Sequence, residues 1–247
     1  MGSTLVTVVS LYGPKDEPLR GLLAHIQAIA ARRLGAAFAP YPPGQVHGTL
    51  IVLSGYRDDT GATVNEHYLT CRGERHPMDF DQVQRLLLAQ LAEPMAIRIG
   101  GFGPGDNAPF TSQGRPLHER SFTAAGGPLV LIGWPVLSLA SGGRSRPLDA
   151  LRRAMAPAGV LHRYHAGPAD VDDDFHAVVG HHAPHAPPGQ VAATVAAVRE
   201  FLATHPIEVQ VGLGQVRILA ADAPTLAAPW FSSRLPVAAA EVARLYR

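Results

Sequence analysis

Two short stretches decide the fold of this chain, Val46-His47-Gly48-Thr49-Leu50-Ile51-Val52 and Phe175-His176-Ala177-Val178-Val179-Gly180. Each is a run of β-branched and apolar residues with one His near its start, which predicts a largely buried β-strand. Each is followed by a helical pattern, then a Pro and a strand that ends before a Gly, at 94–100 and at 206–212. This loose internal repeat predicts two similar lobes around a shared cleft, with one His from each lobe.

The rest of the chain alternates between strand and helix patterns, which indicates an α+β fold. The expected domain covers 1–247 as a single bilobal unit with interleaved lobes, two antiparallel-rich sheets around a central cleft, and helices on the outside. Residues 54–78 are polar and predict an irregular insertion, while 207–211 and 216–220 predict a hairpin. The expected strands are 4–11, 46–53, 95–99, 121–123, 129–136, 175–180, 207–211 and 216–220, and the expected helices are 19–34, 80–91, 147–155, 191–203 and 235–246.

Composition narrows the class of protein. The 247 residues are 47% hydrophobic and 17% charged, which excludes a disordered chain. The formal net charge of +1 gives no global basic field, so duplex DNA is not an expected partner. The single Cys71 excludes a disulfide framework and a thiolate metal cage. The longest apolar stretch, 128–140, is shorter than the roughly 20 residues of a membrane span, and no signal peptide is evident, so we expect a soluble cytoplasmic protein.

The first His-bearing strand presents a pair of chemically useful groups. His47 and Thr49 are two residues apart, so both side chains point to the same face of the strand. An imidazole beside a hydroxyl suits a phosphate oxyanion, because the hydroxyl donates a hydrogen bond and the imidazole transfers a proton. The alternative is a half-buried His at a strand start, with Thr as an ordinary β-former.

The second His-bearing strand repeats the arrangement in part. His176 and Val178 share a face, as His47 and Thr49 do. Two imidazoles in one cleft can act as an acid–base pair, since an unperturbed pKa near 6.5 lets one be neutral while the other is charged. Two strands of this kind make a catalytic role more credible than either does alone.

Other residues are weaker candidates. Arg98 alternates with apolar neighbours on its strand and points either into the cleft toward phosphate or out to solvent. The run His181-His182-Ala183-Pro184-His185 is either a solvated loop or a metal site, since imidazole suits zinc, copper and nickel. Four aromatic side chains are candidates for stacking on a base, although each also fits a core or loop position: Tyr12, Tyr41, Phe102 and Trp134.

The order of these motifs resembles that of the two-histidine (2H) phosphoesterases, including the LigT-like RNA 2′,3′-cyclic phosphodiesterases. His47-Gly48-Thr49-Leu50 is similar to the first His-x-Thr/Ser-hydrophobic motif, and Phe175-His176-Ala177-Val178-Val179 lies where the second belongs. Residues 121–136, 151–160 and 207–222 resemble the central strand, the helix before the second motif and the closing hairpin. The resemblance implies a metal-independent mechanism that uses no cofactor. In it, one of the two histidines takes a proton, the other donates one, and Thr49 holds a phosphate oxygen.

The sequence departs from the family pattern at two positions. Val178 stands where the second motif normally has Thr or Ser, so one phosphate-binding hydroxyl is missing. His181 stands where several bacterial members carry an Arg, and a protonated imidazole there can still bind phosphate. The substrates implied are a small cyclic nucleotide, a 2′–5′ oligonucleotide or a single-stranded RNA end. The alternatives are a degenerate 2H-like protein that binds a nucleotide or RNA end without turnover, and a His-loop metalloenzyme.

Overall fold

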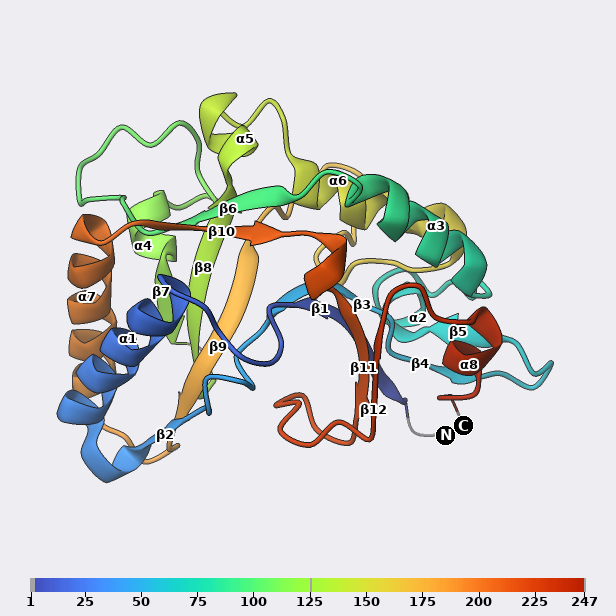
Figure 1. Ribbon diagram of the computed structural model, residues 1–247, viewed down its shortest axis with the longest axis horizontal. Coiled ribbons are helices and arrows are strands. Elements are labelled where there is room, and N and C mark those ends of the chain that lie inside the picture. Colours follow the sequence, from blue (N-terminus) through green and yellow to red (C-terminus); the bar gives the residue numbers. More distant parts are fainter. Residues whose placement is uncertain (1–2, 125, 247) are drawn as a thin grey trace.

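A computed structural model describes residues 3–124 and 126–246 (Figure 1). The expected strands are present, with ends shifted by at most two residues. The strands are β1 Leu5–Ser10, β2 Phe38–Pro40, β3 Gly48–Val52, β4 Gly55–Arg57, β5 Thr63–Asn65, β6 Met95–Ile99, β7 Phe122–Ala124, β8 Pro128–Pro135, β9 Phe175–His182, β10 Ile207–Val211, β11 Arg217–Ala221 and β12 Phe231–Arg234.

Helices occupy most of the expected ranges. The first long helix has apolar residues at spacings of three and four, and Gly35 ends it at a φ of 53°, which suits glycine. Asp79 caps the third by accepting a hydrogen bond from the Gln82 amide. The helices are α1 Leu19–Leu34, α2 Glu66–Arg72, α3 Phe80–Gln90, α4 Leu117–Arg120, α5 Val136–Ala140, α6 Pro147–Ala154, α7 Pro188–Thr204 and α8 Ala239–Ala243.

One antiparallel sheet organises the molecule. Its strand order is β10-β6-β8-β9-β3-β1-β11-β12, with β2 beside β9 and β7 beside β8, while β4 and β5 form a separate ribbon. The two His-bearing strands, β3 and β9, meet in the middle and pair only at Gly48 and Ala177. The expected α+β fold with antiparallel sheets is thus confirmed, and the two expected sheets are the halves of one sheet joined at this pair.

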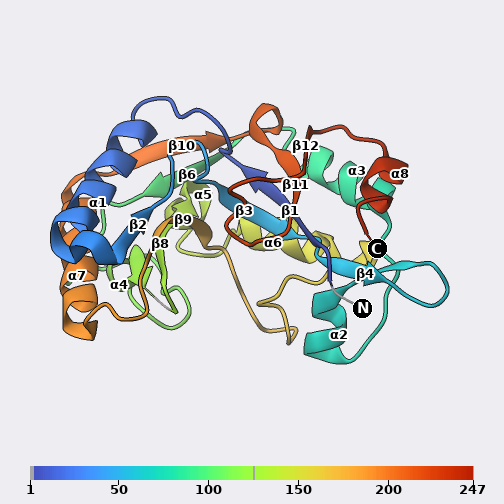
Figure 2. The same ribbon diagram turned by 90° about the horizontal axis from the view of Figure 1, so that it is seen from below.

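Helices cover each half of the sheet separately (Figures 1 and 2). Helix α1 packs against α7, and both contact the half that contains β9. Helix α3 packs against α6 and α8 over the half that contains β3. The buried cluster beneath these helices includes Leu23, Ile26, Leu50, Phe175 and Val198. This packing fixes both central strands from one side.

Four details differ from the sequence-based expectations. Residues 54–78 are not irregular, because they contain the β4–β5 ribbon and α2, whose first turn is capped by the Asn65 side chain. The expected helix over 235–246 is shorter, since the residue before Pro236 is disfavoured from helical conformation. Strands β10 and β11 form no hairpin, because β10 pairs with β6 and β11 with β1. The repeat also fails at its second strands, since β6 and β10 lie side by side in one half.

The link between β10 and β11 shows that the sheet is strongly curved. These strands lie toward opposite ends of the strand order, yet few residues separate Val211 from Arg217. A chain of that length spans at most roughly 20 Å, so the two halves must bend toward each other. The short 3₁₀ turn Leu213–Gln215 makes the crossing.

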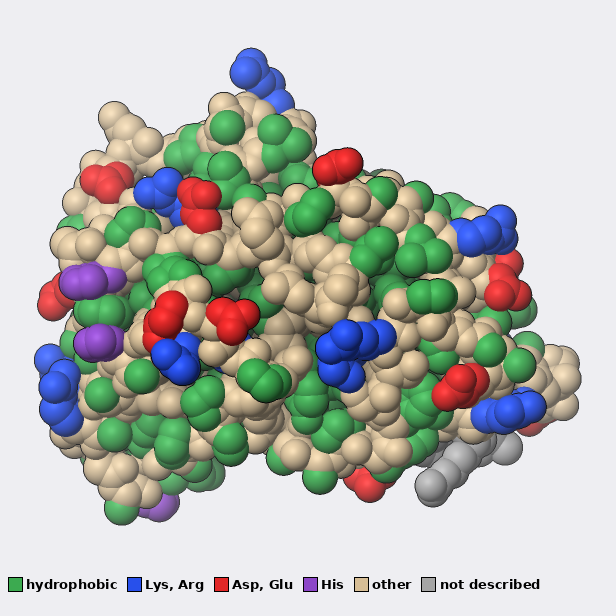
Figure 3. Space-filling view, in the orientation of Figure 1, with side chains coloured by type: hydrophobic (Ala, Val, Ile, Leu, Met, Phe, Trp, Pro, Cys, Tyr) green, Lys and Arg blue, Asp and Glu red, His purple; other side chains and the backbone are tan. Residues whose placement is uncertain are grey.

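The surface agrees with the near-zero net charge. Figure 3 shows acidic and basic side chains interspersed with apolar ones over the face it displays. Within residues 3–124 and 126–246, the helices lack the length and apolar character needed to cross a membrane.

Candidate active site

The two His-bearing strands lie next to each other in opposite directions. Gly48 of β3 pairs with Ala177 of β9. Extending this antiparallel register by one residue places Thr49 opposite His176, and diagonal neighbours in such a ladder lie about 7–8 Å apart. His47 is therefore a diagonal neighbour of His176 on the same face of the sheet. This separation allows one phosphate group to contact both imidazoles.

A cleft of about 600 Å³ opens on that face. His47, Thr49, His176 and Val178 all line it, as the alternation of side chains along the two strands requires. Further side chains close its sides, from α2, α4, α6 and the loops around 113, 163 and 225. They include Glu66, His67, Gln113, Arg120, Arg152, His162, Arg163, Tyr164 and Leu226.

Gly48 lets the strand pack tightly on the opposite face. A Cβ at this position would lie 1.8 Å from Cζ of Phe175, a residue with 1% exposure. Only glycine therefore fits between His47 and Thr49 while Phe175 fills the core. The Gly of the first motif is explained by packing behind the cleft.

His47 is held in a defined tautomer. Its Nδ1 lies 2.7 Å from the carbonyl oxygen of Gln45, so Nδ1 carries a proton and donates it. In the neutral ring, Nε2 is then the acceptor. Burial lowers the pKa of His47, the hydrogen bond to Gln45 opposes this effect, and nearby Lys15 adds to it. His47 is thus suited to accept a proton.

His176 lies beside buried carboxylates. Its Nε2 is 3.8 Å from Oδ2 of Asp174, and its side chain is 24% exposed. Burial lowers the pKa of His176 below its ordinary value; Asp172 and Asp174 oppose this shift, and Arg152 and Arg120 add to it. The nearby Asp174 carboxylate stabilises the positively charged imidazole once His176 has taken up a proton.

Asp174 is fixed by several donors. The Ser112 hydroxyl lies within 2.8 Å of both carboxylate oxygens, and Trp134 Nε1 donates to Oδ1 at 2.7 Å. Arg120 Nη2 donates to Oδ2, also at 2.7 Å. With donors on both oxygens, the carboxylate is held in one orientation.

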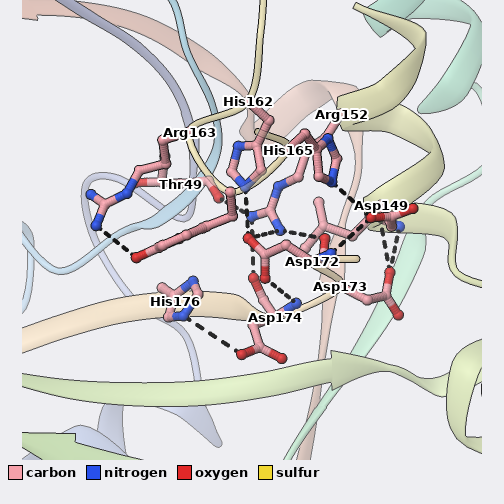
Figure 4. Close-up of polar contacts among 12 residues, drawn as sticks. Thr49, Asp149, Arg152, His162, Arg163, His165, Asp172, Asp173, Asp174 and His176 are labelled. Atoms are coloured by element: carbon pink, nitrogen blue, oxygen red, sulfur yellow. Dashed lines mark hydrogen bonds and ion pairs between the residues drawn. The ribbon is translucent and has the colours of Figure 1, made fainter. Parts of the chain in front are cut away.

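Arg152 joins the strand of the first motif to the segment that leads into the second (Figure 4). Its side chain, 2% exposed, donates to the carbonyl oxygens of Thr49 and Leu50 in β3. It also donates to the carbonyl oxygens of Asp172 and Asp174 and lies 3.0 Å from Oδ2 of Asp172. One guanidinium therefore positions both sides of the cleft relative to each other.

Two more His–Asp pairs surround Arg152. His162 Nε2 lies 2.6 Å from Asp172, and His165 Nε2 lies 2.8 Å from Asp149. Figure 4 shows one ring nitrogen of His162 directed at Asp172. Burial lowers the pKa of His162 to about 4, so the ring is neutral at pH 7. Within the described chain, Nδ1 of His162 has no hydrogen-bond partner.

The remaining sequence-based candidates lie elsewhere. Arg98 is not among the described residues that line the cleft, and it lies 3.7 Å from Glu208 on the neighbouring strand. Tyr41 and His181 also lie outside the cleft and contact each other, with Tyr41 Oη 2.6 Å from His181 Nε2. Thr49 alone of the four binding candidates lines the cleft with the two histidines, and a phosphate-binding role for the other three stays a prediction.

Some of the aromatic candidates are buried in the core, and one lies near the cleft. Phe102 and Trp134 are buried in one cluster, at 8% and 0% exposure, and cannot stack on a base. The ring of Tyr12 lies 6.1 Å from that of His47, although its hydroxyl is bonded to the Leu226 carbonyl. Tyr164 was not a candidate, yet it is 38% exposed, lines the cleft and lies 6.2 Å from the His176 ring.

The run 181–185 is not the expected loop throughout. His181 and His182 are the last residues of β9 and pair with Ala39 and Phe38 of β2. His181 contacts Tyr41, and Nδ1 of His182 lies 3.0 Å from the Ala183 carbonyl oxygen. In the described part of the chain, no three His, Cys, Asp or Glu side chains are placed to hold a metal ion.

Comparisons with known proteins give no sequence-level match: no family model and no curated protein matches the chain. Two solved structures are similar over most of its length. The protein TT0787 of Thermus thermophilus is 18% identical, with 94% of each chain covered and a TM-score of 0.36. Usb1 of Kluyveromyces marxianus, solved with uridine monophosphate, is 9% identical, with 95% of this chain and 97% of that chain covered and a TM-score of 0.39.

Proposed function

We propose that this chain is a metal-independent phosphodiesterase that hydrolyses a cyclic or 2′–5′ phosphodiester of a nucleotide or RNA end. The observation that supports it most is the meeting of His47, Thr49 and His176 on one face of two adjacent strands, in the wall of one cleft. The cleft volume of about 600 Å³ is in the range of sites that bind small molecules. The resemblance of both motifs to the 2H phosphoesterases points to the same chemistry.

The contacts of the two histidines favour one assignment of their roles. Nε2 of His47 accepts a proton from water as the water oxygen attacks phosphorus, since Nδ1 is held as a donor by Gln45. In its protonated form, which Asp174 stabilises, His176 donates a proton to the leaving ester oxygen as the phosphorus–oxygen bond breaks. The Thr49 hydroxyl donates a hydrogen bond to a non-bridging oxygen. His47 gains one proton and His176 loses one. Each turnover therefore leaves His47 protonated and His176 neutral, the reverse of the starting state.

Val178 supports a second candidate function. Its side chain lines the cleft at the position where the family has a hydroxyl. A missing donor to an anion costs about one to a few kcal/mol, or roughly ten- to a thousandfold in rate. A protein that binds a nucleotide or RNA end without turning it over would fit this change.

Hydrolysis of 2′,3′-cyclic nucleotides and 2′–5′ dinucleotides in excess chelator separates the candidates. Wild type is compared with His47→Ala and His176→Ala, and nucleotide binding is measured for all three. Turnover that survives chelation and is lost in both variants supports the proposal. Binding without turnover supports the degenerate binder, and turnover abolished by chelation supports a metalloenzyme and refutes the two-histidine mechanism.

A further inference from the structure

A second groove continues from the candidate active site. Its volume is about 860 Å³, and it shares Gln113, Arg120 and Thr123 with the cleft that contains the two histidines. The groove runs between the β7 strand, the 112–115 turn and the exposed side of α7. The groove and the cleft are therefore continuous, and a ligand bound at His47 and His176 can extend from the cleft into the groove.

The groove is rich in guanidinium groups. Arg115, Arg120 and Arg199 line it, and none of the described side chains that line it is acidic. The molecule as a whole has a net charge of only +1, so this concentration of guanidinium groups is local. Such a site attracts phosphate, because guanidinium binds phosphate oxygens in pairs.

Two of the three guanidinium groups are fixed by other contacts. Arg120 is fixed by Asp174 at 2.7 Å, and Arg199 donates from Nε to the carbonyl oxygen of Phe122 at 2.9 Å. The pKa of Arg199 is lowered by burial and by the positive charges of Arg115 and Arg120, while Glu119 opposes the shift. A bound anion would relieve the repulsion among these three groups.

The groove also has apolar lining. This lining comes from Val191 and Val195 of α7, which precede Arg199 on the same face of that helix, together with Pro184, Ala186 and Pro188. A nucleotide presents the same two characters, since its phosphate is anionic and its base and sugar carry apolar surface. A free inorganic anion would use only the guanidinium groups.

We infer that this groove binds the nucleotide next to the reacting one, with Arg115 and Arg199 on its phosphate, and that the substrate is a single-stranded oligonucleotide. This inference rests on the proposed function, because it takes the cleft with the two histidines as the place of the reacting phosphate. Arg120 then lies at the junction, close to both phosphates. The groove would make the chain selective for RNA ends over free mononucleotides.

The test is equilibrium binding of two ligands by fluorescence anisotropy, a labelled trinucleotide 3′-phosphate and a labelled mononucleotide 3′-phosphate. Wild type is compared with Arg115→Gln, Arg199→Gln and the control Arg32→Gln, an exposed residue in the last turn of α1. We expect the trinucleotide to bind at least about tenfold more tightly than the mononucleotide. Each groove variant should reduce that preference and lower the slope of log K against log salt by about 0.7, the value for one phosphate contact on a single strand.

Three results would overturn the inference: no preference of wild type for the trinucleotide, equal losses for both ligands, or the same loss in Arg32→Gln. Displacement of the trinucleotide by poly-glutamate, at an equal concentration of negative charges, would also overturn the inference, because the groove would then bind anions in general. Melting temperatures of all variants check that folding is retained. Hydrolysis is followed in parallel, so that oligonucleotide binding without turnover refutes the proposed function alone, and turnover without the binding preference refutes the groove alone.

Discussion

Replacing Arg152 by Met should destabilise the protein by about 3–5 kcal/mol, the cost of removing one partner from a buried ion pair. The guanidinium has 2% exposure and is bonded to four backbone carbonyl groups as well as to the Asp172 carboxylate. Met fills a similar volume but leaves the carboxylate and the carbonyl oxygens without this donor. Arg152→Lys keeps the charge and loses the forked geometry, so it should fall between Met and wild type.

Urea unfolding followed by circular dichroism measures this loss, and thermal unfolding should show Tm lower by about 6–20 °C for a domain of this size. The control is Arg153→Met on the same helix. Arg153 is 36% exposed, pairs with Asp149 in an i,i+4 arrangement and donates to the carbonyl oxygens of Pro168 and Asp170 at the surface. An exposed ion pair of this kind is worth at most about 1 kcal/mol. A loss below about 1 kcal/mol for Arg152→Met, or equal losses for the two variants, would refute the view that this guanidinium holds the two motifs together.

Three further predictions concern the cleft. Gly48→Ala should cost about 1–3 kcal/mol of unfolding free energy and reduce activity, because the added Cβ would overlap Phe175. The control Gly189→Ala should be neutral or stabilising, since a Cβ there meets no heavy atom within 4 Å. Urea titrations of both variants check this. Val178→Thr should raise kcat/KM about tenfold by returning a phosphate donor to the cleft, and an unchanged or lower value would count against that role. The pKa of His162 is about 4 in the folded protein, against an ordinary value of 6.5. The neutral ring therefore contributes up to about 3 kcal/mol to the free energy of unfolding above pH 6.5, and this contribution is lost as the pH falls toward 4. His162→Gln should flatten the pH dependence of stability between these two pH values.

Local sequence patterns predicted most of the elements because each is encoded by nearby residues. The α1 bounds follow from apolar spacing and from Gly35, and the strands around His47 and His176 follow from β-branched runs. Partners of strands are not encoded locally, which is why 207–211 and 216–220 were expected to pair with each other. The expected common face of His47, Thr49 and His176 needed only the two-residue period of a strand, and the β3–β9 pair brings the three residues together.

The polar network behind the cleft was not predicted, although one signal for it exists. Arg152 lies four residues after Leu148 and three before Met155, both fully buried, so it is on the apolar face of its helix. A charged residue there requires a buried partner, and the acidic run Asp172-Asp173-Asp174 directly before β9 supplies it. Arg98 and His181 show the limit of such reasoning, because strand alternation gives the face of a side chain without giving what covers that face.

The position of β1 in the sheet bears on how the chain reaches its native state. β1 lies between β3 and β11, and its residue Leu5 pairs with Ala221. A strand made early in synthesis must wait for a partner made near the end, and contacts between such distant residues slow folding. Until β11 arrives, β1 and β3 expose one unpaired, apolar edge, which invites association with other chains. We therefore expect the nascent protein to depend on chaperones more than its compact native surface would indicate.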